Sequence, residues 1–479
     1  MTIITVLVVY FVAMMCIGIY FSRGLKTGDD FNVAGRNQHW IWVFAGFVAI
    51  QTGAGATITM TGLTYTVGGA AIWWQVSNGI VFWLYGLTVT KYFRRARCAT
   101  ISEYMFDHFG RRTRFLTDIL MPLVGTAGAA AQVAGMAAIL SALTPLSYDM
   151  SAIIGMGVCM IYIFLGGLKA VQATDLVQVI LVVGAIVATF IMCTQKLGPL
   201  NTLNTETLGD NARWIWSDFI GSNQKSFMWF ICMTISWYVS RVGAQACFMQ
   251  NASARNERYA VITQRWGGFV PIILGVLTVW LGQYAQIYLE NAKPDSVLPT
   301  MINEMLPPIV AGILVAGLAA ACMSTADANL NAVSSSLNEI AKYWFKMDEK
   351  YSLRFSRIGI VVFGVVAVLL VIRLRSIYNL LMLLFDLSAP YVAQMHAPIL
   401  YKRCTEGAAF WTFLIGIPTV FIYRYCFPAA AANIMPVAFT LAVCVVCMVV
   451  ISEVQRATGK FKPMIMLDYE AIHAGKDNK

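Results

Sequence analysis

The sequence predicts an all-α integral membrane protein with about 13 transmembrane helices. Of its 479 residues, 58% are hydrophobic and 12% are charged, against roughly 45–50% and 25% in an average soluble protein. Its 24 acidic and 34 basic residues are too few to cover a soluble protein of this length. Windows of about 20 apolar residues recur, each long enough to cross a ~30 Å hydrocarbon core as a helix. Because the windows are continuous rather than alternating, they are typical of helices and not of barrel strands.

Thirteen such windows follow one another along the chain. They span residues 2–22, 40–64, 71–93, 115–142, 147–167, 171–194, 226–248, 263–289, 307–343, 355–373, 377–400, 408–427 and 434–453. The first window is not expected to be a cleavable signal peptide, because no basic residues precede it. Charged Arg23, Lys26 and Asp29 follow it where a signal peptide has a small-residue cleavage site.

The distribution of basic residues predicts the orientation of the chain. If the N-terminus lies outside the cell, cytoplasmic segments hold 26 of the 34 Lys and Arg residues, external segments hold seven, and Arg241 falls within a window. This asymmetry follows the positive-inside rule. We therefore expect a multi-pass protein of the plasma (cell inner) membrane, with an external N-terminus, a cytoplasmic C-terminus and the lipid bilayer as a partner. No basic stretch is interleaved with aromatic residues, so nucleic acid is not an expected partner.

Cysteine and histidine residues do not indicate an enzyme or a metal centre. Most of the 11 cysteines fall within the windows, where we expect them to act as small packing residues. The Cys444-x-x-Cys447 pair has no second pair, and the four histidines are dispersed, so the usual metal-ligand spacings are missing. We therefore expect no catalytic residues and no redox cofactor.

Three windows are interrupted by glycine or polar residues. The second contains AIQTGAGAT (49–57), the seventh SWYVSRVGAQA (236–246), and the ninth the polar stripe AACMSTADANLNAVSSS (320–336). Glycine weakens a helix, and irregular backbone at membrane depth persists only where it is buried or lines a cavity. The second and seventh windows are five helices apart, as in an inverted five-plus-five repeat whose broken helices bound the solute and ion sites. For either break alone, glycine used only for close packing is the alternative.

At these residues the sequence resembles the sodium:solute symporter family, which includes sodium-coupled transporters of sugars, proline, pantothenate, sialic acid and choline. The matching segments occur in family order. They are DFNVAGR (30–36), AIQTGAGA (49–56), GGLKAVQATDLVQ (166–178), the Q-x4-Q segment Gln245 to Gln250, and CMSTADANLNAVSSS (322–336). The ADANL portion is most similar to the choline and pantothenate branches.

The resemblance implies a ten-helix core of two inverted five-helix repeats, of the leucine-transporter type. One extra helix precedes this core and two follow it. The implied segments are an N-terminal helix and cytoplasmic loop (1–38), the first repeat (39–194), an external loop (195–225), the second repeat (226–403), two extra helices (404–455) and a cytoplasmic tail (456–479).

The resemblance also implies a Na⁺ site where the broken first core helix meets the eighth. The implied ligands are the backbone carbonyls of Ala49, Thr52 and Ala321 and the hydroxyls of Ser324 and Thr325. The spacing agrees, because positions 321, 324, 325 and 328 share one helical face, and carbonyls freed by unwinding suit a hard cation. For the two hydroxyls alone, bonding to the preceding turn is the alternative.

Some members of the family have a second sodium site one turn further inward, and here it maps to Asp175, Ser324 and Asp327. Where two-sodium members of one branch have serines, this chain has Asp327 and Ala328. A carboxylate within a membrane is expensive to bury and is therefore a functional candidate. Asp327 has several candidate roles: ligand of a second Na⁺ with Asp175, proton carrier, counter-ion of Arg241 or of a cationic solute, or member of a structural pair.

Arg241, in the interrupted seventh window, is the main indication of the solute. A guanidinium fits the planar geometry of a carboxylate, and the neighbouring aromatic residues suit an apolar or cationic body. The predicted solute-binding residues are Gln51, Trp237, Tyr238, Arg241 and Gln245. Alternatively, Arg241 is paired with Asp327 or lies near the outer mouth. The chain departs from the family pattern at Ala244, where the family has an acidic residue, and at Asn251, where it has an arginine.

The sequence therefore predicts a secondary active transporter, a symporter that couples Na⁺ entry to uptake of a small anionic or zwitterionic organic solute by alternating access. One Na⁺ moving down a ~100 mV potential and a ~tenfold gradient supplies about 3.7 kcal/mol, enough for roughly 500-fold accumulation of a neutral solute. A monoanion entering with one Na⁺ retains only about tenfold, which favours two ions. A proton-coupled carrier of the same fold that uses Asp327 or Asp175 is the alternative. The sequence indicates no oligomeric state.

Overall fold

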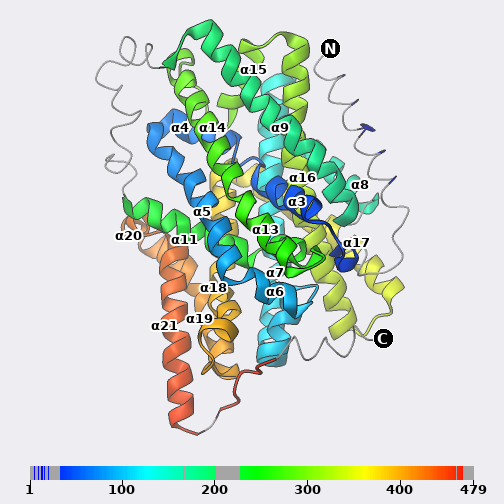
Figure 1. Ribbon diagram of the computed structural model, residues 1–479, viewed down its shortest axis with the longest axis vertical. Coiled ribbons are helices and arrows are strands. Elements are labelled where there is room, and N and C mark those ends of the chain that lie inside the picture. Colours follow the sequence, from blue (N-terminus) through cyan, green and yellow to red (C-terminus); the bar gives the residue numbers. More distant parts are fainter. Residues whose placement is uncertain are drawn as a thin grey trace.

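The computed structural model describes residues 33–165, 168–200, 227–459 and 461–467, together with isolated positions among the first 20. Throughout these ranges the regular elements are α-helices and short 3-10 helices, which confirms the predicted all-α class. Seven of the described helices are long and apolar enough to cross a membrane, and many lie along the long axis of the molecule (Figure 1). The predicted first span (2–22), most of the external loop (195–225) and the end of the cytoplasmic tail lie outside the described residues.

The segment predicted as the first repeat folds into helices that follow the apolar windows, with one break. Short 3-10 turns lie at Ala34–Arg36 (η1) and Gly68–Ile72 (η2). The α-helices are α3 (Trp40–Gln51), α4 (Ile58–Val67), α5 (Trp73–Thr88), α6 (Thr90–Ala96), α7 (Ile101–Leu143), α8 (Tyr148–Leu165) and α9 (Leu168–Leu197).

The segment predicted as the second repeat also contains one broken helix, and it adds short elements at the loops. Its elements are α11 (Phe227–Gly243), α12 (Gln245–Ser253), α13 (Glu257–Gly267), α14 (Phe269–Tyr288), η4 (Pro294–Ser296), α15 (Val297–Met305), α16 (Pro308–Trp344), α17 (Glu349–Leu374) and α18 (Ile377–Leu400). Beyond it come α19 (Glu406–Cys426), α20 (Pro428–Asn433) and α21 (Pro436–Ala457). The windows did not predict α15 and α20, because both are too short to cross a membrane.

The element α7 begins at Ile101, but non-helical backbone at Gly110, with φ 73° and ψ −167°, divides it into a short first segment and a long one that contains the predicted span of residues 115–142. Thr100 caps its first turn, because Thr100 Oγ1 accepts the N–H of Glu103 and the Glu103 carboxylate accepts the N–H of Thr100, each at 3.2 Å. Such a capping box satisfies donors that would otherwise be unpaired at a helix start. Hydropathy located only the apolar part of α7, since the polar first turns depend on capping rather than on burial in lipid.

Helices α7 and α16 pack against each other through the middle of the molecule (Figure 1). Every residue of α7 from Val124 to Leu140 is buried, as is every residue of α16 from Leu314 to Asn338. Gly125 allows this close approach, because a Cβ there would lie 2.7 Å from Val333 Cγ2. Small residues at helix contacts are the usual means of packing helices within a membrane.

Replacing Gly125 with alanine should destabilise this contact. The new methyl group would meet the side chain of Val333 and, at 3.0 Å, the carbonyl oxygen of Asn329, and such overpacking costs roughly 1–3 kcal/mol. The melting temperature of the purified protein should fall. Gly184→Ala in α9 is the matched control, because a Cβ there has nothing within 4 Å. Equal melting temperatures for the two variants would show that the helices tolerate a wider spacing.

Candidate functional site

The first helix break lies between α3 and α4, where the sequence predicts it. Helix α3 ends at Gln51, Thr52 follows as its C-cap with φ −99° and ψ 10°, and α4 begins at Ile58. A neighbouring helix supports the irregular backbone, because the N–H of Ala54 donates to Gln132 Oε1 of α7 at 2.8 Å. This hydrogen bond satisfies a buried donor that a continuous helix would have paired internally.

The second break separates α11 from α12 at Ala244, which has φ −77° and ψ 118°. Here the hydroxyl of Tyr391 on α18 donates to the carbonyl oxygen of Gly243 at 2.7 Å. Gly243 also permits this approach, since a Cβ there would lie 2.9 Å from the Tyr391 oxygen. Both predicted breaks are present, in corresponding positions of the two predicted repeats.

Three of the five predicted sodium ligands converge beside the first break, and we call Ala49, Ala321 and Thr325 the oxygen cluster. Thr325 Oγ1 lies 2.9 Å from Ala49 O and 3.0 Å from Ala321 O. Thr52, a fourth predicted ligand, adjoins this cluster, because its N–H is 3.2 Å from Ala49 O. Gly53 leaves space here, since a Cβ would lie 2.7 Å from Thr325 Oγ1. The break therefore brings carbonyl and hydroxyl oxygens of α3 and α16 to one place.

The fifth predicted ligand, Ser324, donates its hydroxyl to Asp175 of α9. Asp327 lies close enough to Asp175 for the two carboxylates to repel each other, and both are at most 1% exposed. One oxygen of each carboxylate has no hydrogen-bond partner within the described part of the chain, and no basic side chain described there offsets either charge. The three residues predicted for the second ion site thus lie together, with Asp175 of α9 bonded to Ser324 of α16 and close to Asp327 of the same helix.

A small cavity of about 40 Å³, the central cavity, adjoins both breaks. The first break and α16 contribute Ile50, Gln51, Gly53, Gly55, Ala56, Thr325 and Asn329, the second contributes Trp237, Ser240, Ala244, Ala246 and Cys247, and α7 and α18 contribute Gly128, Gln132, Leu381, Leu384 and Phe385. None of these lining residues is charged. Because Thr325 lines the central cavity, the oxygen cluster forms part of its wall.

Of the five predicted solute-binding residues, only Gln51 and Trp237 line the central cavity. Gln245 faces the start of α7 instead, where its side-chain oxygen accepts the N–H of Ile101 at 2.8 Å and its amide nitrogen donates to Ala99 O at 3.1 Å. With both ends of its amide bonded to backbone, Gln245 ties α12 to α7. In this structure Gln245 therefore does not line the central cavity.

Tyr238 also lies away from the central cavity. Its hydroxyl is 2.6 Å from His396 Nε2 and 2.8 Å from Thr88 Oγ1, at an apolar cavity that α21 helps to line. The tyrosine therefore joins α11 to α5 and α18. Its position one residue after Trp237 turns it about 100° around the helix, which is why the two neighbours face different cavities.

Arg241 pairs with α5 rather than with Asp327 or with the central cavity. Its Nη2 donates to Asn78 Oδ1 at 2.7 Å, and its Cζ lies 3.6 Å from the centre of the Phe82 ring. The arginine follows Ser240, a residue that lines the cavity, and is therefore turned about 100° away from it. Asn78 and Phe82 lie in the third window, remote in sequence from Arg241, so no sequence pattern marked them as the partners.

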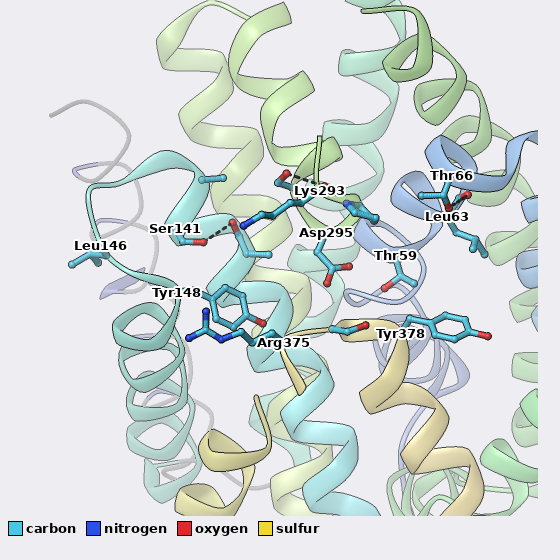
Figure 2. A pocket seen from close by; sticks show the side chains of 15 residues that line it. Thr59, Leu63, Thr66, Ser141, Leu146, Tyr148, Lys293, Asp295, Arg375 and Tyr378 are labelled. Carbon is cyan, nitrogen blue, oxygen red and sulfur yellow. Dashed lines mark hydrogen bonds between the residues drawn. The ribbon is translucent and has the colours of Figure 1, made fainter. Parts of the chain in front are cut away.

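A second cavity, of about 790 Å³, lies along α4, from Thr59 in its first turn to Thr66 near its end, and we call it the vestibule. Figure 2 shows Lys293, Asp295, Tyr148, Arg375 and Tyr378 around it. The sequence did not single out these residues, because they come from separate loops and helix ends that only the fold brings together.

The vestibule is bordered by fixed charges. Arg375 Nη2 lies 2.8 Å from both carboxylate oxygens of Asp149, which joins the end of α17 to the start of α8. Burial raises the pKa of Asp295 above its usual range, and the hydrogen bond from the N–H of Ile377, at 3.2 Å, partly offsets this effect. Thr59, in the first turn of α4, also lines the vestibule, so this cavity reaches close to the first break.

Comparisons with known proteins agree with this arrangement. The model of the family described as "Sodium:solute symporter family" matches residues 31–416. A sodium/sialic acid symporter of Proteus mirabilis (strain HI4320) is 24% identical over 453 residues, which cover 87% of this chain and 88% of that protein. High-affinity choline transporter 1 of Drosophila melanogaster is 24% identical, with 80% of this chain and 64% of that protein covered.

Solved structures show the same fold. A substrate-bound, outward-open Na⁺-coupled sialic acid symporter superposes with a TM-score of 0.82 at 19% identity, covering 98% of this chain and 99% of that one. MhsT in complex with L-phenylalanine gives a TM-score of 0.54 at 11% identity, with 86% and 98% covered. Both likenesses extend over most of the chain.

The matched region contains both breaks, the oxygen cluster and the buried acidic pair. The predicted family, the transporter class and Na⁺ as the coupling ion are confirmed, and the chain is a multi-pass membrane protein rather than an enzyme. This chain belongs to the sodium:solute symporter family.

Proposed function

We propose that this sodium symporter takes up a small organic solute that carries a carboxylate, and that the oxygen cluster binds one of its coupling ions. One observation carries the ion assignment: Thr325 Oγ1 lies within 3.0 Å of both Ala49 O and Ala321 O beside a helix break. Oxygen ligands suit a hard cation, and carbonyls at unwound helices coordinate Na⁺ in transporters with broken helices. The carbonyl of Thr52 and the hydroxyl of Ser324 complete the proposed ligand set.

We propose Asp175, Ser324 and Asp327 as a second cation site. A buried charge without a partner is strongly unfavourable, and within the described residues this acidic pair lacks a basic partner. A cation bound there would offset the repulsion between the carboxylates. A second ion also serves the energetics, because an anionic solute that enters with one Na⁺ gains no driving force from the membrane potential.

The carboxylate on the solute is supported by two relatives named as sodium/sialic acid symporters, from Proteus mirabilis and Aliivibrio fischeri. The vestibule agrees with an outward-facing state, because Lys293 and Arg375 line it and the charge distribution assigns both residues to the external side. We therefore propose that the vestibule opens outside the cell, with the N-terminus outside and the C-terminus inside the plasma membrane.

Closure at the opposite end supports the same state. Gln245 bonds to the backbone at the start of α7, the N–H of Gln38 donates to Ser253 O at 3.0 Å, and Arg94 Nη2 donates to Arg255 O at 3.1 Å. These bonds join both broken helices to the segments that precede α7. Alternating access would require them to break when the solute is released to the cytoplasm.

Thr325→Val tests the oxygen cluster, because it removes the hydroxyl and keeps the side-chain shape. Sodium that binds the folded protein raises its melting temperature. We expect a titration with NaCl, with choline chloride as the reference, to give an apparent sodium affinity at least tenfold weaker in the variant. Tenfold corresponds to about 1.4 kcal/mol, a reasonable value for one lost ligand.

Thr278→Val is the matched control for this titration. Thr278 is equally buried, but its hydroxyl bonds only to Leu274 O and Gly275 O within α14, at 2.8 and 3.2 Å. We expect its sodium response to equal that of the wild type. If Thr325→Val responds like the wild type too, the oxygen cluster is not a sodium site.

Asp175→Asn and Asp327→Asn test the second cation site. With a solute identified by a thermal-shift panel of carboxylates, simultaneous current and tracer uptake should give two Na⁺ per solute in the wild type. Each variant should lose about one charge per solute, because the asparagine amide cannot replace the carboxylate as a counter-ion. Asp386→Asn is the control, since Asp386 is buried but pairs with Arg424.

Two results would contradict this stoichiometry. A net charge that corresponds to one Na⁺ per solute in the wild type, which is zero for a monoanionic solute, together with intact transport in Asp327→Asn, would remove the second site. Uptake that continues unchanged when choline replaces sodium would favour a proton-coupled carrier that uses Asp327 or Asp175.

A further inference from the structure

One residue that lines the central cavity, Trp237, has a hydrogen-bond donor without an acceptor among the described residues. Trp237 is 7% exposed, and its Nε1–H has no acceptor within the described part of the chain. An indole N–H can only donate, and leaving a buried donor unpaired costs about 1–3 kcal/mol. A ligand oxygen in the central cavity would remove this cost.

The start of α12 supplies further donors to the same cavity. No side chain caps this nine-residue helix at Ala244, and its first-turn residues Ala246 and Cys247 line the cavity. The first N–H groups of a helix have no acceptor within the helix, and the helix dipole favours a negative charge at this end. The cavity wall therefore attracts an anionic oxygen without any charged side chain.

Gln51 is a second unsatisfied polar side chain in this place. It lines the central cavity, is 8% exposed, and its Oε1 has no donor within the described residues. An amide offers both donors and an acceptor, so Gln51 suits a solute that carries a hydroxyl or ammonium group beside an acidic oxygen. It reaches the cavity from α3, on the other broken helix from Trp237.

Size and charge limit what this place accepts. About 40 Å³ has room for only a few water-sized groups, since one water occupies roughly 10–15 Å³ on a comparable measure. Arg241 is bound to Asn78 on α5 and does not line the cavity. The nearest positive charge would be a sodium ion at the oxygen cluster, because Thr325 forms part of the cavity wall.

We infer that neutral donors, namely the indole N–H of Trp237 and the first-turn N–H groups of α12, bind the solute carboxylate in the central cavity, while Gln51 Oε1 accepts from a hydroxyl or ammonium group of the solute. Sodium at the oxygen cluster is its counter-ion, and Arg241 is not. The solute is therefore a compact carboxylate, with its remaining atoms against the apolar wall of Leu381, Leu384 and Phe385. This inference rests on the proposed function and assigns the solute-binding groups within it.

Matched pairs of an acid and its primary amide test the inference on the full-length protein. Lactate with lactamide, and propionate with propionamide, keep size and shape nearly constant and change the charge. We expect each acid to raise the melting temperature in NaCl at concentrations at least tenfold lower than its amide. In choline chloride this preference should disappear, because the counter-ion is then missing.

Variants separate the neutral donors from the arginine. Trp237→Phe removes the N–H and keeps a ring, so binding of the acid should weaken about tenfold while the amide changes less than threefold. Gln51→Ala should weaken lactate more than propionate, because only lactate has a hydroxyl that can donate to Gln51 Oε1. Trp229→Phe, on the same helix but outside the cavity, is the control. Arg241→Lys should lower the melting temperature, through loss of the Asn78 contact, without changing the preference for acids.

The outcomes distinguish this inference from the proposed function. The inference is wrong if sodium stabilises the wild type but amides bind as well as acids. It is also wrong if Arg241→Lys, and not Trp237→Phe, removes the preference for acids. In both cases sodium coupling stands. If sodium does not stabilise the wild type, with or without a solute, the proposed function fails.

Discussion

The absence of water in the bilayer core is the constraint on which this structure depends, because every backbone N–H and C=O there needs a partner within the protein. Breaking two helices in that environment requires neighbouring helices to supply the missing bonds. Gln132 does so at the first break and Tyr391 at the second. At the first break, the carbonyl of Ala49 accepts the hydroxyl of Thr325. Oxygen atoms gathered in this way are what make an ion site possible.

The protein handles its few buried charges in two opposite ways. Arg241 lies against neutral groups of α5, because its Nη2 donates to Asn78 and its Cζ lies over the Phe82 ring, while its Nε and Nη1 have no hydrogen-bond partner within the described residues. Asp175 and Asp327 repel each other instead, and the described residues provide no cation to offset them. A permanent contact, such as that of Arg241 with Asn78, is typical of a structural charge. Carboxylates without a basic partner, such as Asp175 and Asp327, are typical of groups that bind a cation during a transport cycle.

Much of the fold was predictable because lipid acts on the sequence in a simple way. A window of about 20 apolar residues has few alternatives to a spanning helix, so the windows at 377–400 and 408–427 match α18 and α19 closely. The breaks were predictable too, because glycine and polar residues interrupt the second window near Thr52 and the seventh window near Gly243. The early start of α7 was not, since it depends on the capping box of Thr100 and Glu103, a local hydrogen-bond pattern that hydropathy does not contain.

The sequence by itself determined that lipid surrounds the protein, the positions of most of the described helices, the two breaks and the common helical face of Ala321, Ser324 and Thr325. These properties depend on composition and on spacing along one chain, which are local. Only the tertiary structure decided where Arg241, Gln245 and Tyr238 point, because each is paired with a residue that is remote in sequence and ordinary in type. It also placed Trp237 and Gln51 in the wall of the same central cavity. Contacts between helices depend on how they rotate and pack against each other, and one sequence does not display that rotation.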